Sequence, residues 1–150
     1  MVHRIVADTN VIVSSVLTPG GNPSRIFDAI FNGQLHLILS QAILNEVQRV
    51  FSYEKIQKEL KKSGVTLEDI DAFLSKIIRI STVVPGKIDL DIIKNDPDDN
   101  MFLACAIEGQ ASYIISGDQH LISIHIHEGI EIVNPFVLTS PLMSNPSDFS

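Results

Sequence analysis

The chain contains 150 residues, 45% of them hydrophobic, and carries a formal net charge of −7. This length allows one domain with a substantial apolar core but is short for two ordinary domains. The negative charge argues against a protein that binds nucleic acid through a basic surface, because such surfaces neutralise phosphates directly. A bound metal ion would reverse that argument locally.

Cysteine usage and hydropathy bear on where the protein works. Cys105 is the single cysteine and cannot form an internal disulfide, so a reducing compartment is expected. No run approaches the roughly 18 apolar residues of a membrane-spanning helix. The opening stretch, MVHRIVADTN, lacks the basic and long apolar regions of a secretory signal. The sequence therefore predicts a cytoplasmic protein that does not enter a membrane.

Short apolar segments with the composition of buried strands recur along the chain, at residues 4–7, 36–39, 80–84, 112–116 and 130–133. Between them, apolar residues repeat every three or four positions, as in helices that pack on a sheet. Strands that alternate with helices favour parallel pairing through right-handed crossovers. The sequence thus predicts an α/β fold with helices on both faces of a parallel sheet.

Helix boundaries are marked by capping and turn residues. The expected signals are Asn22-Pro23 at one start, Asn32-Gly33 at its end, Ser40 at a second start, Ser63-Gly64 after a basic segment, and Thr66 with Asp69 as a capping box. The last residues are polar, contain proline and have no periodicity. We therefore expect a domain over 1–139 and a flexible C-terminal tail over 140–150.

Three acids fall where ligands bind in parallel α/β sheets, beyond the carboxyl ends of the strands. Asp8 follows the first predicted strand and Asp118 follows the fourth, but each could also begin a turn or cap a helix. Glu46 lies at the border of a helical apolar stripe, where it could reach the sheet or turn to water.

A fourth acid lies within the cluster NDPDDN. If Pro97 begins a helix, Asp96 is its N-cap, and Asp98 and Asp99 occupy its first turn. Capping explains one acid but not three neighbouring like charges. Asp99 precedes the small side chains of a helix face that could approach the sheet, and the role of Asp98 stays open.

Carboxylates that converge in one cleft repel each other and need a cation. Oxygen ligands without a cluster of cysteine or histidine favour Mg²⁺ or Mn²⁺ over zinc. Such ions can hold a phosphate and activate water for in-line displacement. His125 and His127 are two residues apart, but no third ligand completes a zinc site, and a catalytic role for His120 is not expected. Cys105 has no evident histidine partner and is expected to be a buried structural thiol.

Four stretches together resemble the PIN domain family, in particular its single-domain toxins of toxin–antitoxin pairs. They are IVADTNVIVSSVL, ILNEV, DPDDNMFLACAIEGQASYIISGD and IVNPFVL. The resemblance implies a three-layer α/β/α fold with a five-stranded parallel sheet of order 3-2-1-4-5. It also implies a ribonuclease that depends on Mg²⁺ or Mn²⁺, acts on RNA, pairs with an antitoxin protein and forms a homodimer.

The resemblance assigns the family's acidic quartet and its polar support residues to positions of this chain. The quartet is Asp8, Glu46, Asp99 and Asp118, and the support residues are Thr9, Asn10 and Ser116. Many relatives carry a further acid two residues after the fourth, where this chain has His120.

Two other classes of protein stay open. One is another acidic-cleft phosphoryl hydrolase. A haloacid-type phosphatase would need a second aspartate where this chain has Asn10, and a receiver domain would need an aspartate at the end of the third strand, where STVVPGK has none. The other is a non-catalytic PIN-fold module that binds RNA or protein, against which the complete quartet argues.

Overall fold

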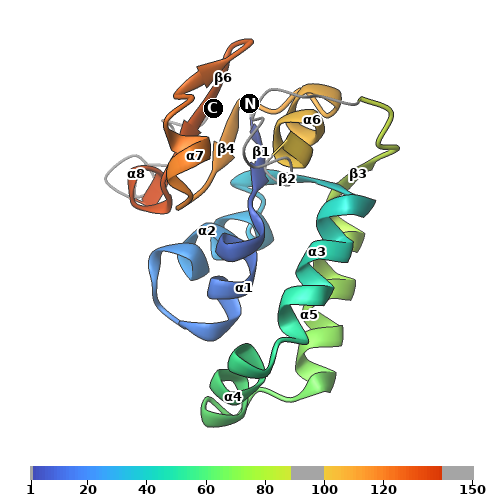
Figure 1. The fold of residues 1–150 in the computed structure, drawn as a ribbon, viewed down its shortest axis with the longest axis vertical. Coiled ribbons are helices and arrows are strands. Elements are labelled where there is room, and N and C mark those ends of the chain that lie inside the picture. The colour runs from blue at the N-terminus through green and yellow to red at the C-terminus, as the bar shows by residue number, and fades with distance from the viewer. Residues whose placement is uncertain (1, 89–99, 140–150) are drawn as a thin grey trace.

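The computed structural model describes residues 2–88 and 100–139 and shows a six-stranded sheet of order β3-β2-β1-β4-β6-β5 (Figure 1). The strands are β1 (His3–Ala7), β2 (Leu35–Ser40), β3 (Thr82–Val84), β4 (Tyr113–Ile115), β5 (Ile126–His127) and β6 (Ile130–Val133). Five strands pair in parallel, in the order that the resemblance implies.

One edge strand was not expected. β5 pairs antiparallel with β6 and extends the sheet beyond the five parallel strands. The connection between them consists of Glu128 and Gly129, which both have positive φ, at 50° and 80°. Two left-handed residues in succession give the tight turn whose twist matches a β-hairpin.

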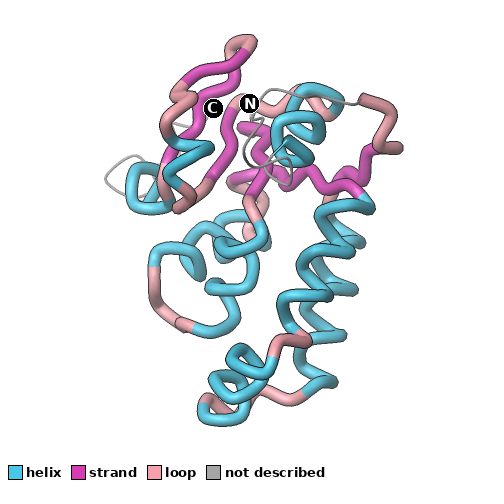
Figure 2. Tube along the Cα trace, in the orientation of Figure 1, coloured by secondary structure: helices cyan, strands magenta, loops and turns pink. Residues whose placement is uncertain are grey.

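Helices flank the sheet and connect its parallel strands (Figure 2). They are α1 (Thr9–Leu17), α2 (Asn22–Phe31), α3 (Gln41–Phe51), α4 (Glu54–Lys62), α5 (Leu67–Ile80), α6 (Asn100–Glu108), α7 (Gln119–Ile122) and α8 (Pro135–Thr139). α6 packs on β1, β2 and β4. The rings of Phe27, Phe31 and Phe73 contact one another and join α2 to α5.

Most of the predicted helix boundaries are confirmed. The Ser40 hydroxyl accepts a hydrogen bond from Ile43 N, and Thr66 and Asp69 form a reciprocal capping box. The predicted N-cap at Asn22 is wrong by one residue. Gly21 is the cap, because its carbonyl already accepts from Arg25 N at 3.0 Å, and glycine has no side chain with which to cap the helix. Pro23 is consequently the second helical residue.

α3 and α5 extend away from the sheet, with α4 at their far end (Figure 1). Side chains of α3 and α5 line a common hollow, so the two helices lie close together. The basic segment, RVFSYEKIQKELKK at residues 49–62, is divided between α3 and α4, and its lysines and arginine are exposed. No helix among the described residues is long and apolar enough to cross a membrane. The acids Asp96, Asp98 and Asp99 and the predicted tail over 140–150 lie outside the described residues.

Candidate active site

A small cleft of about 110 Å³ lies beyond the carboxyl ends of β1 and β4, where β2 and β4 flank β1 on opposite sides. Its lining consists of Asp8, Thr9, Asn10, Glu46, Val50, Met101, Phe102 and Asp118. The structure thus brings together three of the four predicted acids and two of the three predicted support residues. Asp99 lies outside the described residues, directly before α6, whose Met101 and Phe102 line this cleft.

Asp8 joins β1 to α1. Its backbone N donates to Ile115 O of β4 at 3.0 Å, and its Oδ1 accepts from Val11 N at 2.9 Å as the N-cap of α1. The residue is only 4% exposed. Capping therefore fixes the carboxylate beside the cleft. It leaves acceptor capacity for a ligand, because each carboxylate oxygen has two lone pairs.

Ser116 connects the two aspartates at the strand ends. It is fully buried after β4, and its hydroxyl donates to Asp8 Oδ2 and accepts from Asp118 N at 2.9 Å. The pairing of Ala7 with Ile115 places these groups opposite each other. Ser116 does not line the cleft but holds Asp8 from behind.

Burial raises the pKa of Asp8 above its ordinary value of 3.8. The hydrogen bonds from Ser116 and Val11 favour the carboxylate and oppose this shift, whereas the charge of Asp118 adds to it. The folded protein therefore disfavours a negative charge on Asp8 unless a cation approaches it.

The chemistry of the lining fits a hard divalent cation. Thr9 Oγ1 is buried and has no hydrogen-bond partner among the described residues. A buried hydroxyl without a partner is costly, so it indicates a water molecule or a ligand at this position. Carboxylates with a hydroxyl are the donors that Mg²⁺ and Mn²⁺ prefer. Within residues 2–88 and 100–139, no three carboxylate, histidine or cysteine side chains are grouped closely enough to hold an ion by themselves.

Glu46 reaches the cleft from α3, at the border of its apolar face as the sequence predicted. Its side chain is 18% exposed, and its Oε2 forms an ion pair with Arg49 Nη2. Arg49 was not among the predicted site residues, because it was assigned to the basic segment. Its distance of three residues from Glu46 was the available signal, since such pairs face each other on a helix.

Cys105 is buried, as predicted. Burial raises the pKa of its thiol to about 12, which keeps it protonated and unsuited to nucleophilic attack.

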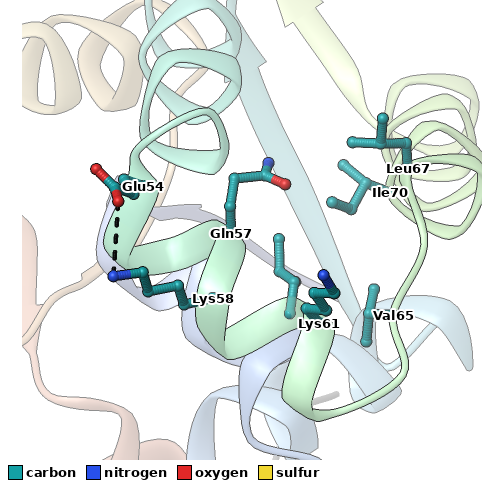
Figure 3. A pocket seen from close by; sticks show the side chains of 8 residues that line it. Glu54, Gln57, Lys58, Lys61, Val65, Leu67 and Ile70 are labelled. Atoms are coloured by element: carbon teal, nitrogen blue, oxygen red, sulfur yellow. Dashed lines mark ion pairs between the residues drawn. The ribbon is translucent and has the colours of Figure 1, made fainter.

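A larger hollow of about 300 Å³ lies between α4 and the start of α5, away from the acids (Figure 3). Leu60, Val65 and Ile70 contribute apolar surface, and the Glu54–Lys58 ion pair lies at its edge. It has no group of carboxylates comparable to the cleft of Asp8 and Glu46.

Comparison with known proteins identifies the family. Residues 4–120 match the PIN domain. The uncharacterized protein MJ1680 of Methanocaldococcus jannaschii is 31% identical over 146 residues, a match that covers 97% of this chain and 88% of that protein.

Solved structures share the fold. A chain of VapBC2 from Rickettsia felis, bound to a DNA fragment from their promoter, has a TM-score of 0.57 at 12% identity and covers 87% of this chain and 98% of that one. PAE2754 from Pyrobaculum aerophilum has a TM-score of 0.57 at 13% identity, covering 96% and 91%. Since the PIN match spans most of the chain and contains all four predicted acids, this protein belongs to the PIN domain family.

Proposed function

We propose that this protein is a ribonuclease that hydrolyses RNA phosphodiester bonds with Mg²⁺ or Mn²⁺. The observation that carries the proposal is the cleft beyond the carboxyl ends of β1 and β4, which Asp8, Glu46 and Asp118 line in a PIN fold. PIN domains are generally nucleases and typically use divalent metal ions. The acidic character of the chain is compatible with such an activity, because the ion replaces the positive charge that the protein surface lacks.

In this proposal the acids act together as ligands. Asp8, Glu46 and Asp118 would hold the ion, and Asp99 is the fourth proposed ligand. The bound ion would supply positive charge to a substrate phosphate and activate the attacking water. Ser116 keeps Asp8 in place through its hydroxyl, while Thr9 and Asn10 line the cleft and would offer polar groups to the ion or to the substrate phosphate. No side chain needs to act as a covalent nucleophile.

The biological setting belongs to the same proposal. The fold likeness to VapBC2 supports a toxin of a toxin–antitoxin pair, neutralised by an antitoxin protein and active in the cytoplasm. A homodimer is also proposed, from the family resemblance. The partnership would be tested by expressing this chain together with a candidate antitoxin and asking whether the two proteins copurify.

The activity is tested with purified protein and a fluorescently labelled single-stranded RNA. Cleavage is expected with Mn²⁺ or Mg²⁺ and should stop when EDTA is added. Asp118→Asn should lower the rate at least about a hundredfold, the scale of losing one catalytic group. Asp71→Asn is the matched control, since Asp71 is exposed on α5 and outside the cleft. Cleavage that persists in Asp118→Asn at the wild-type rate would contradict the proposal.

A further inference from the structure

Arg49 forms an ion pair with Glu46, a proposed metal ligand. Its Nη2 pairs with Glu46 Oε2 one turn earlier on α3. The Glu46 side chain is 18% exposed and lines the cleft, whereas that of Arg49 is 58% exposed and does not. Val50, the next residue in the chain, does line the cleft. Glu46 therefore both lines the cleft and pairs with Arg49, a residue outside the lining.

The Arg49–Glu46 pair can be exchanged for another interaction. An exposed ion pair shifts an equilibrium by less than about fivefold, because water and salt screen it and long side chains lose entropy in holding it. Once Glu46 ligates a divalent ion, two positive charges lie close to the guanidinium and repel it. Arg49 and the ion thus compete for the same carboxylate.

Arg49 has another use once it leaves Glu46. Among residues 2–88 and 100–139 it has no second ion-pair partner. Its planar guanidinium matches a phosphate with two parallel hydrogen bonds. Because its side chain is exposed and its backbone adjoins a cleft residue, a phosphate of a bound nucleic-acid strand lies within its reach.

We propose that Arg49 is an exchangeable cation of the active site. It neutralises Glu46 in the metal-free protein, and it transfers to a backbone phosphate of the RNA substrate when Glu46 ligates the divalent ion. The competition for Glu46 and the phosphate contact are two consequences of one side-chain movement. This inference rests on the proposed function, because it takes Glu46 as a ligand and RNA as the substrate.

The competition between Arg49 and the ion for Glu46 is tested by titrating the protein with Mn²⁺ in the absence of RNA. Electron paramagnetic resonance measures the free Mn²⁺. Arg49→Gln should bind Mn²⁺ about two- to fivefold more tightly, since a competing cation is gone. The matched control is Lys62→Gln, which removes one positive charge from an exposed pair with Glu59 at the same three-residue distance. Its Mn²⁺ affinity should equal that of the wild type.

The contact between Arg49 and an RNA phosphate is tested by RNA cleavage at saturating Mn²⁺. Arg49→Gln should raise KM about tenfold, the loss expected for one charge-assisted phosphate contact, and leave kcat within about twofold. Arg49→Lys keeps the charge but lacks the planar guanidinium that can form two parallel hydrogen bonds, so it should give an intermediate KM. Lys62→Gln should leave both parameters unchanged.

The outcomes separate this inference from the proposed function. Arg49→Gln protein that binds Mn²⁺ no more tightly than the wild type, or that keeps the wild-type KM, overturns the role of Arg49 while the ribonuclease assignment stands. Weaker Mn²⁺ binding in Arg49→Gln would make Arg49 a residue that positions Glu46, and so would also overturn the competition. Wild-type protein that neither binds Mn²⁺ nor cleaves RNA defeats the proposed function and this inference with it.

Discussion

The Ser116 hydroxyl donates a hydrogen bond to Asp8 Oδ2 and thereby ties the end of β4 to the end of β1. The same hydroxyl accepts from Asp118 N at 2.9 Å, so one buried oxygen orients both strand-end aspartates. Ser116 is fully buried, and its hydrogen bond favours the charged form of Asp8, whose pKa is raised by burial.

Ser116→Ala should destabilise the fold and loosen the site. Removing the hydroxyl leaves Asp8 Oδ2 and Asp118 N without this partner in a buried position, which costs about 1 to 3 kcal/mol in the free energy of unfolding. Urea unfolding followed by circular dichroism measures this loss. Ser112→Ala, at an exposed serine before β4, is the control and should stay within about 0.5 kcal/mol of the wild type. Equal unfolding free energies for the two variants would contradict the bridging role.

Asp8→Asn should stabilise the metal-free protein at neutral pH. The folded-state pKa of Asp8 is raised above 3.8, so the stability that its protonated form contributes is complete below that pH and is lost as pH rises through the folded pKa. Asparagine stays neutral, can still accept from Val11 N, and can donate to Ser116 Oγ. Thermal melts in EDTA should therefore show a higher Tm for Asp8→Asn at pH 7 and no advantage below about pH 3.8.

Adding Mg²⁺ supplies the converse measurement for Asp8. It should raise the Tm of the wild type more than that of Asp8→Asn, because a ligand that binds only the folded state stabilises it. An Asp8→Asn protein that melts lower than the wild type at pH 7 in EDTA would show that burial of the charge is not the dominant effect.

The parallel strands could be predicted from sequence because short apolar runs between turn signals determine them locally. α1 was not predicted, since Val11, Ile12 and Val13 are β-branched and lack helical spacing. Its helix depends on the Asp8 cap and on packing against α2 and α3, which only the folded chain provides. β5 depends on Glu128 at positive φ, a conformation that its residue type does not indicate.

The acids of the site could be proposed from sequence, but their mutual geometry could not. Asp8 and Asp118 follow strands that the sequence reveals, and the rule for strand ends makes each a candidate. The hydrogen bond from Ser116 depends on the register that pairs Ala7 with Ile115, about a hundred residues apart in the chain. Such registers follow from packing over the whole sheet.

Gly109→Ala should disrupt the packing of α6 on the sheet. A methyl group there would lie 2.3 Å from Ile38 Cγ2 and 3.2 Å from Cys105 O, and the Ile38 side chain is fully buried. Overpacking of this kind costs about 1 to 3 kcal/mol. Gly117→Ala is the comparison, because nothing lies within 4 Å of its added methyl and its φ is not in the left-handed region.

Urea unfolding of both glycine variants measures the difference. Gly117→Ala should stay within about 0.5 kcal/mol of the wild type. A loss at Gly109→Ala as small as that would mean that α6 can shift away from Ile38 at little cost.

Asp96 and Asp99 are predicted to play opposite roles, although both lie outside the described residues. Asp96→Ala removes a predicted N-cap, so it should lower the free energy of unfolding by about 0.5 to 2 kcal/mol and leave much of the cleavage activity.

Asp99→Asn removes a predicted ligand, so it should abolish metal-dependent cleavage. It should also keep or raise the Tm in EDTA, because the predicted acidic quartet then carries one like charge fewer. Melts and cleavage rates of both variants, measured side by side, check this division. An Asp96→Ala protein that loses activity while Asp99→Asn retains it would transfer the ligand role from Asp99 to Asp96.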